Sequence, residues 1–176
     1  MKKKYGIAFI PKVKIKKFIS LACNNAKNAV DYCVGDGSFP HVTICQFYYE
    51  SKNIPALWVA LCNHLDKFQI NLTFKKYSHI TFGRDIHWVS LLPEEGNELK
   101  NLFSIISAYV KPIRSDQYDP HLTLFNYKSC EKDALDLVES INISDRFDLI
   151  LGEFDEVGQL VRILRKDPID RPKSNI

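Results

Sequence analysis

The sequence predicts a single α+β domain built from two related halves. Short runs of β-branched and aromatic residues alternate with segments of helical spacing. The pattern Pro-His-aliphatic-Thr-aliphatic also occurs twice, at residues 40–44 and 120–124, so that the two histidines lie 80 positions apart. Each copy opens a predicted strand that follows a helix and a loop. Two similar halves would bring these strands together about a pseudo-twofold axis.

The predicted strands are runs rich in Val, Ile, Thr, Phe and Tyr. They lie at residues 5–10, 41–49, 69–74, 86–92, 121–127, 146–154 and 157–164. Pro11 marks the end of the first strand, and Pro40 is tolerated because it stands at the first position of the second. Residues 75–85 look less regular, and we expect them to form a connecting segment.

Four helices are expected between these strands. They lie within residues 13–30, 54–68, 93–110 and 131–140. The first two show apolar residues at helical spacing, and the loop 35–38 ends the first. Pro93 and the two glutamates after it suit the first turn of the third helix, which Pro112 ends. The fourth helix is short and acidic.

Length and composition favour one domain at residues 1–165, followed by a mobile tail at 166–176. A chain of 176 residues with 45% hydrophobic content can bury a substantial core. No apolar run approaches the roughly 20 residues that cross a bilayer, and the apolar stretch near the start is too short for a signal peptide. Five scattered cysteines without a C-x-x-C pair suit a reducing compartment. We therefore expect a cytoplasmic monomer that does not bind membranes.

The positions of the threonines indicate a functional site. Three of the four threonines, Thr43, Thr81 and Thr123, lie two positions after a histidine. Random placement of five histidines and four threonines predicts about a tenth of one such event. On a strand, residues i and i+2 point to the same face, so each motif offers an imidazole and a hydroxyl side by side.

Two such pairs facing each other could catalyse displacement at phosphorus. An imidazole accepts or donates a proton near neutral pH, so we predict that His41 and His121 are a catalytic acid and base. A hydroxyl donates a hydrogen bond to a phosphoryl oxygen, so we predict that Thr43 and Thr123 bind the phosphate. This chemistry requires no metal and no cofactor, because the acid and the base are protein groups.

The two motifs resemble those of the 2H phosphoesterases, and the order of predicted elements is similar to that family over residues 5–164. This family includes RNA 2′,3′-cyclic phosphodiesterases, formerly called 2′-5′ RNA ligases, and enzymes that degrade 2′-5′ oligoadenylates or cyclic oligonucleotide signals. The resemblance implies a bilobal fold of two pseudo-symmetric antiparallel sheets with outer helices around a central cleft. It implies metal-independent opening of a 2′,3′-cyclic phosphate on an RNA end or small nucleotide, with His41 as the acid and His121 as the base.

Two other functions remain open at this stage. The substrate could instead be a 2′-5′ oligoadenylate or a cyclic oligonucleotide, because residues 75–84 depart from the glycine- and aromatic-rich stretch that the family commonly carries there. The chain could also be a non-catalytic RNA-binding module. Intact histidines and threonines in both motifs favour catalysis, since a binding module has no need of two proton-transfer groups.

Several residues outside the two motifs are weaker candidates. Four aromatic residues could stack on a base or could equally belong to the core: Tyr118, Phe9, Trp88 and Tyr127. The third match, at residues 79–82, lacks the preceding proline and the spacing to a partner, so we do not expect it to replace either motif. We expect His64 and His87 to be structural.

Basic residues offer further candidates for contacting phosphate. Arg84 and Arg114 lie in predicted loops, where each could clamp a phosphate or simply face solvent. The lysines within residues 2–17 could form a solvated face or one bank of a phosphate-attracting cleft. The net charge of +3 permits a phosphate-bearing substrate without requiring one.

Overall fold

The computed structural model describes residues 2–26, 29–35, 37–82, 85–114, 118–128 and 141–166. The strands are β1 (Lys2–Pro11), β2 (Ala29–Cys33), β3 (Val42–Glu50), β4 (Gln69–Phe82), β5 (Ile86–Pro93), β6 (Leu122–Lys128), β7 (Ile143–Phe154) and β8 (Leu160–Arg165). The helices are α1 (Ile15–Asn25), α2 (Ile54–Cys62) and α3 (Gly96–Ser107), with a 3₁₀ turn at Ser51–Asn53. The helix predicted at 131–140 and the predicted tail beyond Lys166 lie outside the described residues.

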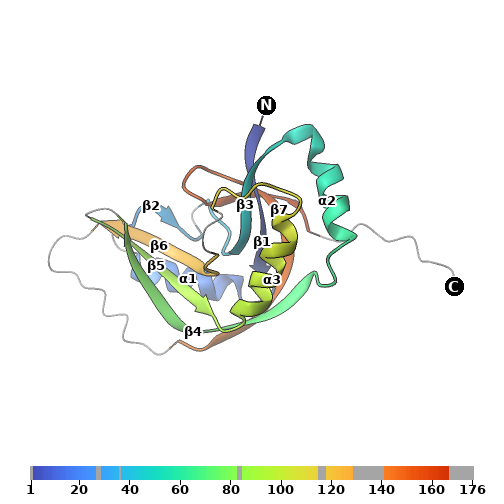
Figure 1. Ribbon diagram of the computed structural model, residues 1–176. Helices are drawn as coiled ribbons and strands as arrows, with labels where there is room; N and C mark the ends of the chain where they lie inside the picture. The colour runs from blue at the N-terminus through green and yellow to red at the C-terminus, as the bar shows by residue number, and fades with distance from the viewer. Residues whose placement is uncertain are drawn as a thin grey trace.

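The strands form one connected antiparallel sheet in the order β1-β3-β6-β5-β4-β7-β8, which confirms the α+β class (Figure 1). β1 pairs with β7 as well as with β3, so the strands from β1 to β7 in this order form a closed ring. β2 lies outside this order and pairs with β6. Two separate sheets were expected, but the long strands β4 and β7 pair with each other and join them. The pseudo-symmetry of the halves stays a prediction.

β3 and β6 meet through a single residue pair, Val42 and Leu122. These are the residues between the histidine and the threonine of the two motifs. Both side chains are fully buried. Because neighbouring residues of a strand point to opposite faces, burial of the middle residue turns the flanking histidine and threonine away from the core. The sheet thus brings the two motifs side by side.

The strand β4 extends well beyond its predicted limit. β4 continues through residues 75–82, where a connecting segment was expected, and that prediction is wrong. Its second half pairs with β5 from Phe74↔Pro93 to Phe82↔Ile86, so the ladder overrides the polar local composition. Pro93 accordingly ends β5, and α3 begins only at Gly96. β2 was not predicted as a strand at all.

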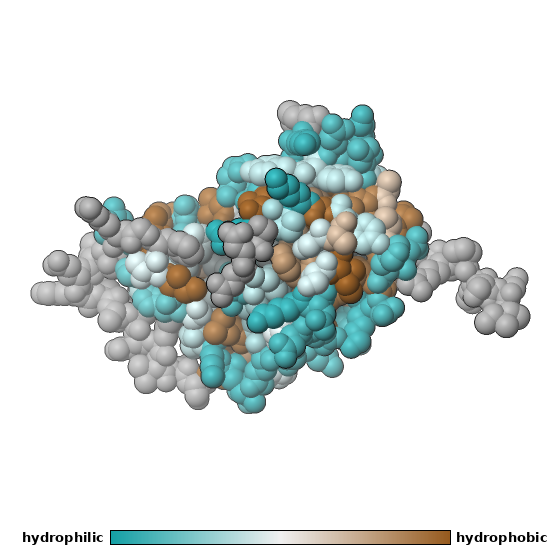
Figure 2. Space-filling model, in the orientation of Figure 1, coloured by the Kyte–Doolittle hydropathy of each residue, from teal (hydrophilic) through white to brown (hydrophobic). Residues whose placement is uncertain are grey.

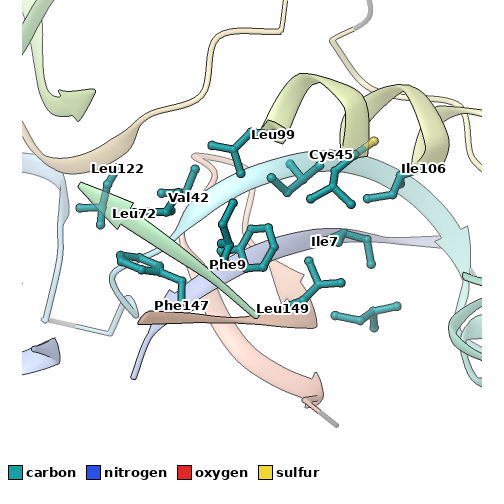
Figure 3. Close-up of a cluster of buried hydrophobic side chains, with 14 of the residues drawn as sticks. Ile7, Phe9, Val42, Cys45, Leu72, Leu99, Ile106, Leu122, Phe147 and Leu149 are labelled. Carbon is teal, nitrogen blue, oxygen red and sulfur yellow. The ribbon is translucent and has the colours of Figure 1, made fainter. Parts of the chain in front are cut away.

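The core lies between the sheet and the three helices. In Figure 3, Leu99 and Ile106 of α3 lie over the strands that carry Phe9, Val42 and Phe147. All five side chains are fully buried. At about 25 cal/mol per Å² of apolar surface, each such residue stabilises the fold by roughly 1.5–3 kcal/mol relative to an exposed position. This packing holds β3, and with it the first motif, in place.

The outer surface is mixed in character. Figure 2 shows hydrophilic side chains over much of the visible face, interrupted by smaller hydrophobic patches. Within the described part of the chain, no helix is long and apolar enough to span a membrane.

Candidate active site

A cleft of about 260 Å³ opens where β3 and β6 meet, and both motifs line it. His41 and Thr43 contribute from the first motif, and His121 and Thr123 from the second. The other lining residues important for the site are Tyr32, Ser90, Trp88, Phe103, Arg114 and Tyr118. The cleft therefore gathers all four residues that the motifs predicted as catalytic or phosphate-binding.

The two histidines are held in the same way. Nδ1 of His41 lies 2.7 Å from the carbonyl oxygen of Phe39, and Nδ1 of His121 lies 2.7 Å from that of Asp119. A carbonyl oxygen only accepts hydrogen bonds, so Nδ1 carries the hydrogen in both rings. Nε2 is then the nitrogen that can accept a proton in the neutral form and donate one in the charged form.

The proline of each motif explains this geometry. Pro40 and Pro120 stand between the accepting carbonyl and the histidine. Proline fixes its own φ and biases the residue before it towards an extended backbone. With both residues restricted, the carbonyl of the residue before proline stays within reach of the imidazole that follows it. The motif thus encodes the tautomer as well as the position of the histidine.

The histidines differ in burial. His41 is only 4% exposed and packs edge-on against the ring of Phe154, with ring centroids 5.2 Å apart. Burial, with a smaller contribution from nearby His121, lowers the pKa of His41 to about 4, against opposing effects of the Phe39 and Gly158 backbone and Asp155. His121 is half-buried. At pH 7 His41 is therefore neutral when the cleft holds no anion.

A tight turn between β7 and β8 closes the cleft beside His41. The carboxylate of Asp155 accepts hydrogen bonds from the backbone N–H groups of Gly158 and Gln159, each at 2.8 Å. Gly158 has φ +104°, a left-handed conformation that glycine adopts at little cost. Val157 and Gly158 line the cleft as a result.

The two threonines are half-buried and have different neighbours. The Ser90 hydroxyl lies 3.4 Å from Oγ1 of Thr123. The backbone carbonyl of Thr43 instead accepts a hydrogen bond of 3.1 Å from the hydroxyl of Tyr118. Burial raises the pKa of Tyr118, so its phenol keeps the proton that it donates. Tyr118, which precedes the second motif, is thereby tied to the first.

Two of the four candidate aromatic residues, Trp88 and Tyr118, line the cleft. The Tyr118 ring also stacks on Phe103, with centroids 4.8 Å apart and planes 2° from parallel. Trp88 lies against Tyr32 at 5.5 Å. These positions put aromatic surface at the cleft, as base stacking would need.

The other two candidate aromatic residues lie elsewhere, which corrects their prediction as cleft residues. Phe9 is fully buried and pairs with Val42 across β1 and β3, on the core face rather than the cleft face. Tyr127 is 8% exposed; its ring stacks on His79, and its hydroxyl lies 3.0 Å from Nε2 of that residue. Neither ring can stack on a base bound in the cleft.

The third His-x-Thr match faces away from the cleft. Its middle residue, Ile80, lines the cleft, so His79 and Thr81 point to the opposite face of β4. Thr81 Oγ1 lies 2.9 Å from Nδ1 of His87. The same sequence pattern thus has the reverse orientation here, and these residues do not join the catalytic pair.

Of the remaining polar candidates, Arg114 lines the cleft, and the others have structural contacts or lie outside the described residues. Nδ1 of His64 lies 3.0 Å from the carbonyl of Ala60 on α2. Arg114 is exposed and lines the cleft, whereas Arg84 lies outside the described residues. Lys3 pairs with Glu153 at 3.5 Å, and Lys4 donates to the Glu156 carbonyl. These lysine contacts fit a solvated face better than a bank of the cleft. Among the described residues, no three His, Cys, Asp or Glu side chains are grouped to hold a metal ion.

Sequence reasoning missed several lining residues, among them Tyr32, Ser90 and Phe103. Ser90 could have been found, because it lies two positions after Trp88 and strand alternation puts both on one face. Tyr32 lies on the unpredicted strand β2. Phe103 lies on α3, and nothing in the helix pattern distinguishes it from a core residue.

Comparison with solved structures identifies the fold. E. coli LigT complexed with 3′-AMP has a TM-score of 0.66 at 16% identity, covering 97% of this chain and 100% of the LigT chain. Usb1 from Kluyveromyces marxianus has a TM-score of 0.60 at 11% identity, covering 94% and 97%. A structure described as a phosphoesterase has a TM-score of 0.56 at 16% identity, covering 97% and 100%.

No family model matches the sequence, and neither does any curated protein. The likeness therefore lies in the three-dimensional structure, over nearly the whole chain. Both motifs, their 80-residue spacing and the cleft between them are in place on this scaffold. The chain has the fold of LigT, that of the 2H phosphoesterases.

Proposed function

We propose that the chain is a metal-independent phosphodiesterase that opens a 2′,3′-cyclic phosphate, or cleaves a related phosphodiester, of RNA or a nucleotide. The arrangement of the two histidines carries this proposal. Each Nδ1 is bonded to a carbonyl, which assigns proton transfer to Nε2, and both rings line one cleft beside a threonine hydroxyl. An acid, a base and two phosphoryl donors are the groups that in-line displacement at phosphorus requires.

In this reaction His121 acts as the base and His41 as the acid. Nε2 of His121 removes a proton from water as the water oxygen bonds to phosphorus. The bond from phosphorus to one ring oxygen breaks, and Nε2 of His41 gives that oxygen its proton. The product is a phosphomonoester with a free neighbouring hydroxyl, and proton exchange with solvent resets both rings.

His41 must be protonated for this role, although its pKa is about 4 in the free protein. A phosphoryl anion bound beside the ring favours the charged form and raises that pKa. Thr43 and Thr123 donate to the non-bridging oxygens and hold the anion there. Substrate binding thus charges the acid, and the half-buried position of His121 leaves the base open to the attacking water.

The substrate is a nucleotide or an RNA end. Trp88 and Tyr118 supply aromatic surface beside the motifs, and Arg114 supplies a guanidinium for a phosphate. LigT, which shares the fold, has been solved with 3′-AMP, and structures of that protein with phosphate and with ATP are also known. Nucleotide binding by this chain is consistent with those complexes.

The deciding experiment measures hydrolysis of a 2′,3′-cyclic nucleotide and of a short RNA with that end, in EDTA. Wild type is compared with His41→Ala and His121→Ala. His64→Ala is the matched control, because it also removes an imidazole whose Nδ1 contacts a carbonyl, but outside the cleft. We expect turnover in wild type and the control, and a loss of at least about 10³-fold in either cleft variant.

Other outcomes would redirect the proposal. Turnover only on 2′-5′ linked or cyclic oligonucleotides would retain the chemistry and change the substrate. Binding of RNA by wild type with no hydrolysis of any of these compounds would overturn the proposal in favour of a binding module.

A further inference from the structure

Ser90 is a buried polar residue in the cleft that the two-motif chemistry does not use. It lies on β5 directly opposite Thr123 of β6. The side chain is 6% exposed, and its hydroxyl lies 3.4 Å from Oγ1 of Thr123. That separation exceeds the usual range of about 2.5–3.0 Å for a hydrogen bond between hydroxyls, and catalytic contacts are often long before a ligand binds.

Donor and acceptor capacity determine what this contact can do. A threonine hydroxyl has one hydrogen and two acceptor sites. If Ser90 donates to Oγ1 of Thr123, the hydrogen of Thr123 is left for another acceptor. Each donor in such a chain also polarises the next, which strengthens the outgoing bond. The free hydrogen of Thr123 can then point into the cleft, where a non-bridging phosphoryl oxygen would lie.

The first motif has no equivalent arrangement. Thr43 is paired with Ala8 across β1, and alanine carries no hydroxyl. Thr43 instead accepts a hydrogen bond through its backbone carbonyl, from the hydroxyl of Tyr118. The two threonines therefore differ, and only the hydroxyl of Thr123 has a neighbouring hydroxyl from the paired strand.

We infer that Ser90 is a positioning residue that orients the hydroxyl of Thr123 towards the phosphoryl group. Ser90 donates its hydrogen to Thr123, and Thr123 donates its own to the phosphoryl oxygen. This inference rests on the proposed function, because it takes Thr123 to be a phosphoryl donor. Removal of the Ser90 hydroxyl leaves Thr123 free to rotate, so the loss should appear mainly in the step at which charge builds on the phosphoryl oxygens.

The test is a double-mutant cycle on the hydrolysis of a 2′,3′-cyclic nucleotide. Removal of a direct oxyanion donor typically costs about 10²-fold in kcat, which we expect for Thr123→Val. For Ser90→Ala we expect about a tenfold fall in kcat, with KM changed by no more than about threefold. In the Thr123→Val background, Ser90→Ala should cause no further loss. Ser90→Thr, which keeps a hydroxyl, should retain most of the activity.

Ser144→Ala is the matched control. Ser144 and Thr73 form another cross-strand pair of hydroxyls, 3.0 Å apart between β7 and β4, at an exposed position outside the cleft. This variant makes the same chemical change and should keep wild-type kcat. Thermal unfolding of all variants separates loss of fold from loss of orientation.

Two results would overturn the inference: a Ser90→Ala protein with wild-type kcat, or an equal loss in both Thr123 backgrounds. If wild type hydrolyses none of the substrates, the proposed function fails instead. Binding of inorganic phosphate, measured by calorimetry, then tests Ser90 alone. Ser90→Ala should weaken phosphate binding about threefold when Thr123 is present and leave it unchanged in Thr123→Val. An equal effect of Ser90→Ala in both backgrounds would show that Ser90 does not act through Thr123.

Discussion

Burial of His41 makes the stability of this protein depend on pH within a defined window. The ordinary pKa of a histidine is 6.5, and burial lowers that of folded His41 to about 4. Between these pH values the unfolded chain holds a proton on His41 that the folded chain does not. Since the unfolded state binds more protons there, lowering the pH favours unfolding. The contribution of His41 to the free energy of unfolding is therefore fully present above pH 6.5, and it is lost progressively as the pH falls to about 4.

The size of this effect follows from the two pKa values. At about 1.4 kcal/mol per pKa unit, the difference between 6.5 and about 4 corresponds to about 3 kcal/mol of unfolding free energy. Small domains are typically stable by about 5–15 kcal/mol. One histidine thus accounts for a sizeable part of the acid sensitivity of the protein.

Urea denaturation at several pH values between 7 and 4 measures this contribution. The test compares wild type with His41→Gln, which cannot titrate, and with His64→Gln as an exposed control. Carboxylates affect all three proteins alike and cancel in the comparison. We expect the free energy of unfolding of His41→Gln to fall by about 3 kcal/mol less than that of wild type over this range. Equal slopes for wild type and His41→Gln would refute the reasoning, because they would mean that His41 keeps its ordinary pKa in the fold.

Three further predictions concern the cleft. Saturation with 3′-AMP should raise the pKa of His41 from about 4 by at least about one unit, because a bound phosphate favours the charged ring. NMR titration of a ring proton of His41 measures this pKa, and an unchanged titration midpoint would mean that the phosphate binds elsewhere. A p-nitrophenyl nucleotide diester, whose leaving group needs no proton, should be hydrolysed far better by His41→Ala than by His121→Ala; the reverse result would exchange the acid and the base. Tyr118→Phe removes the hydrogen bond to the Thr43 carbonyl, so it should lower the free energy of unfolding by about 1 kcal/mol and reduce kcat. An unchanged kcat would mean that this hydrogen bond does not contribute to catalysis.

Much of the site follows from the sequence because of the period of a β-strand. A histidine and a threonine two positions apart must share a face, whatever the rest of the fold. A proline before the histidine adds a restricted backbone that brings a carbonyl to Nδ1. Two copies of this unit, at His41 and His121, were therefore enough to predict one site, and the alternation of strands and helices was enough to predict the α+β class.

The same periodicity does not say which face of a strand is buried, and only the tertiary structure decided that. Phe9 lies on the core face of β1, whereas Ile80 lies on the cleft face of β4 and turns the third His-x-Thr pair outward. Pairing with β5 keeps residues 75–82 of β4 in a strand, although their polar local sequence predicts an irregular segment. Burial of His41 and its lowered pKa, like the contact between Ser90 and Thr123, depend on side chains from distant strands. The sequence by itself determined which groups act together, and long-range packing determined where they point and how deeply each of them is buried.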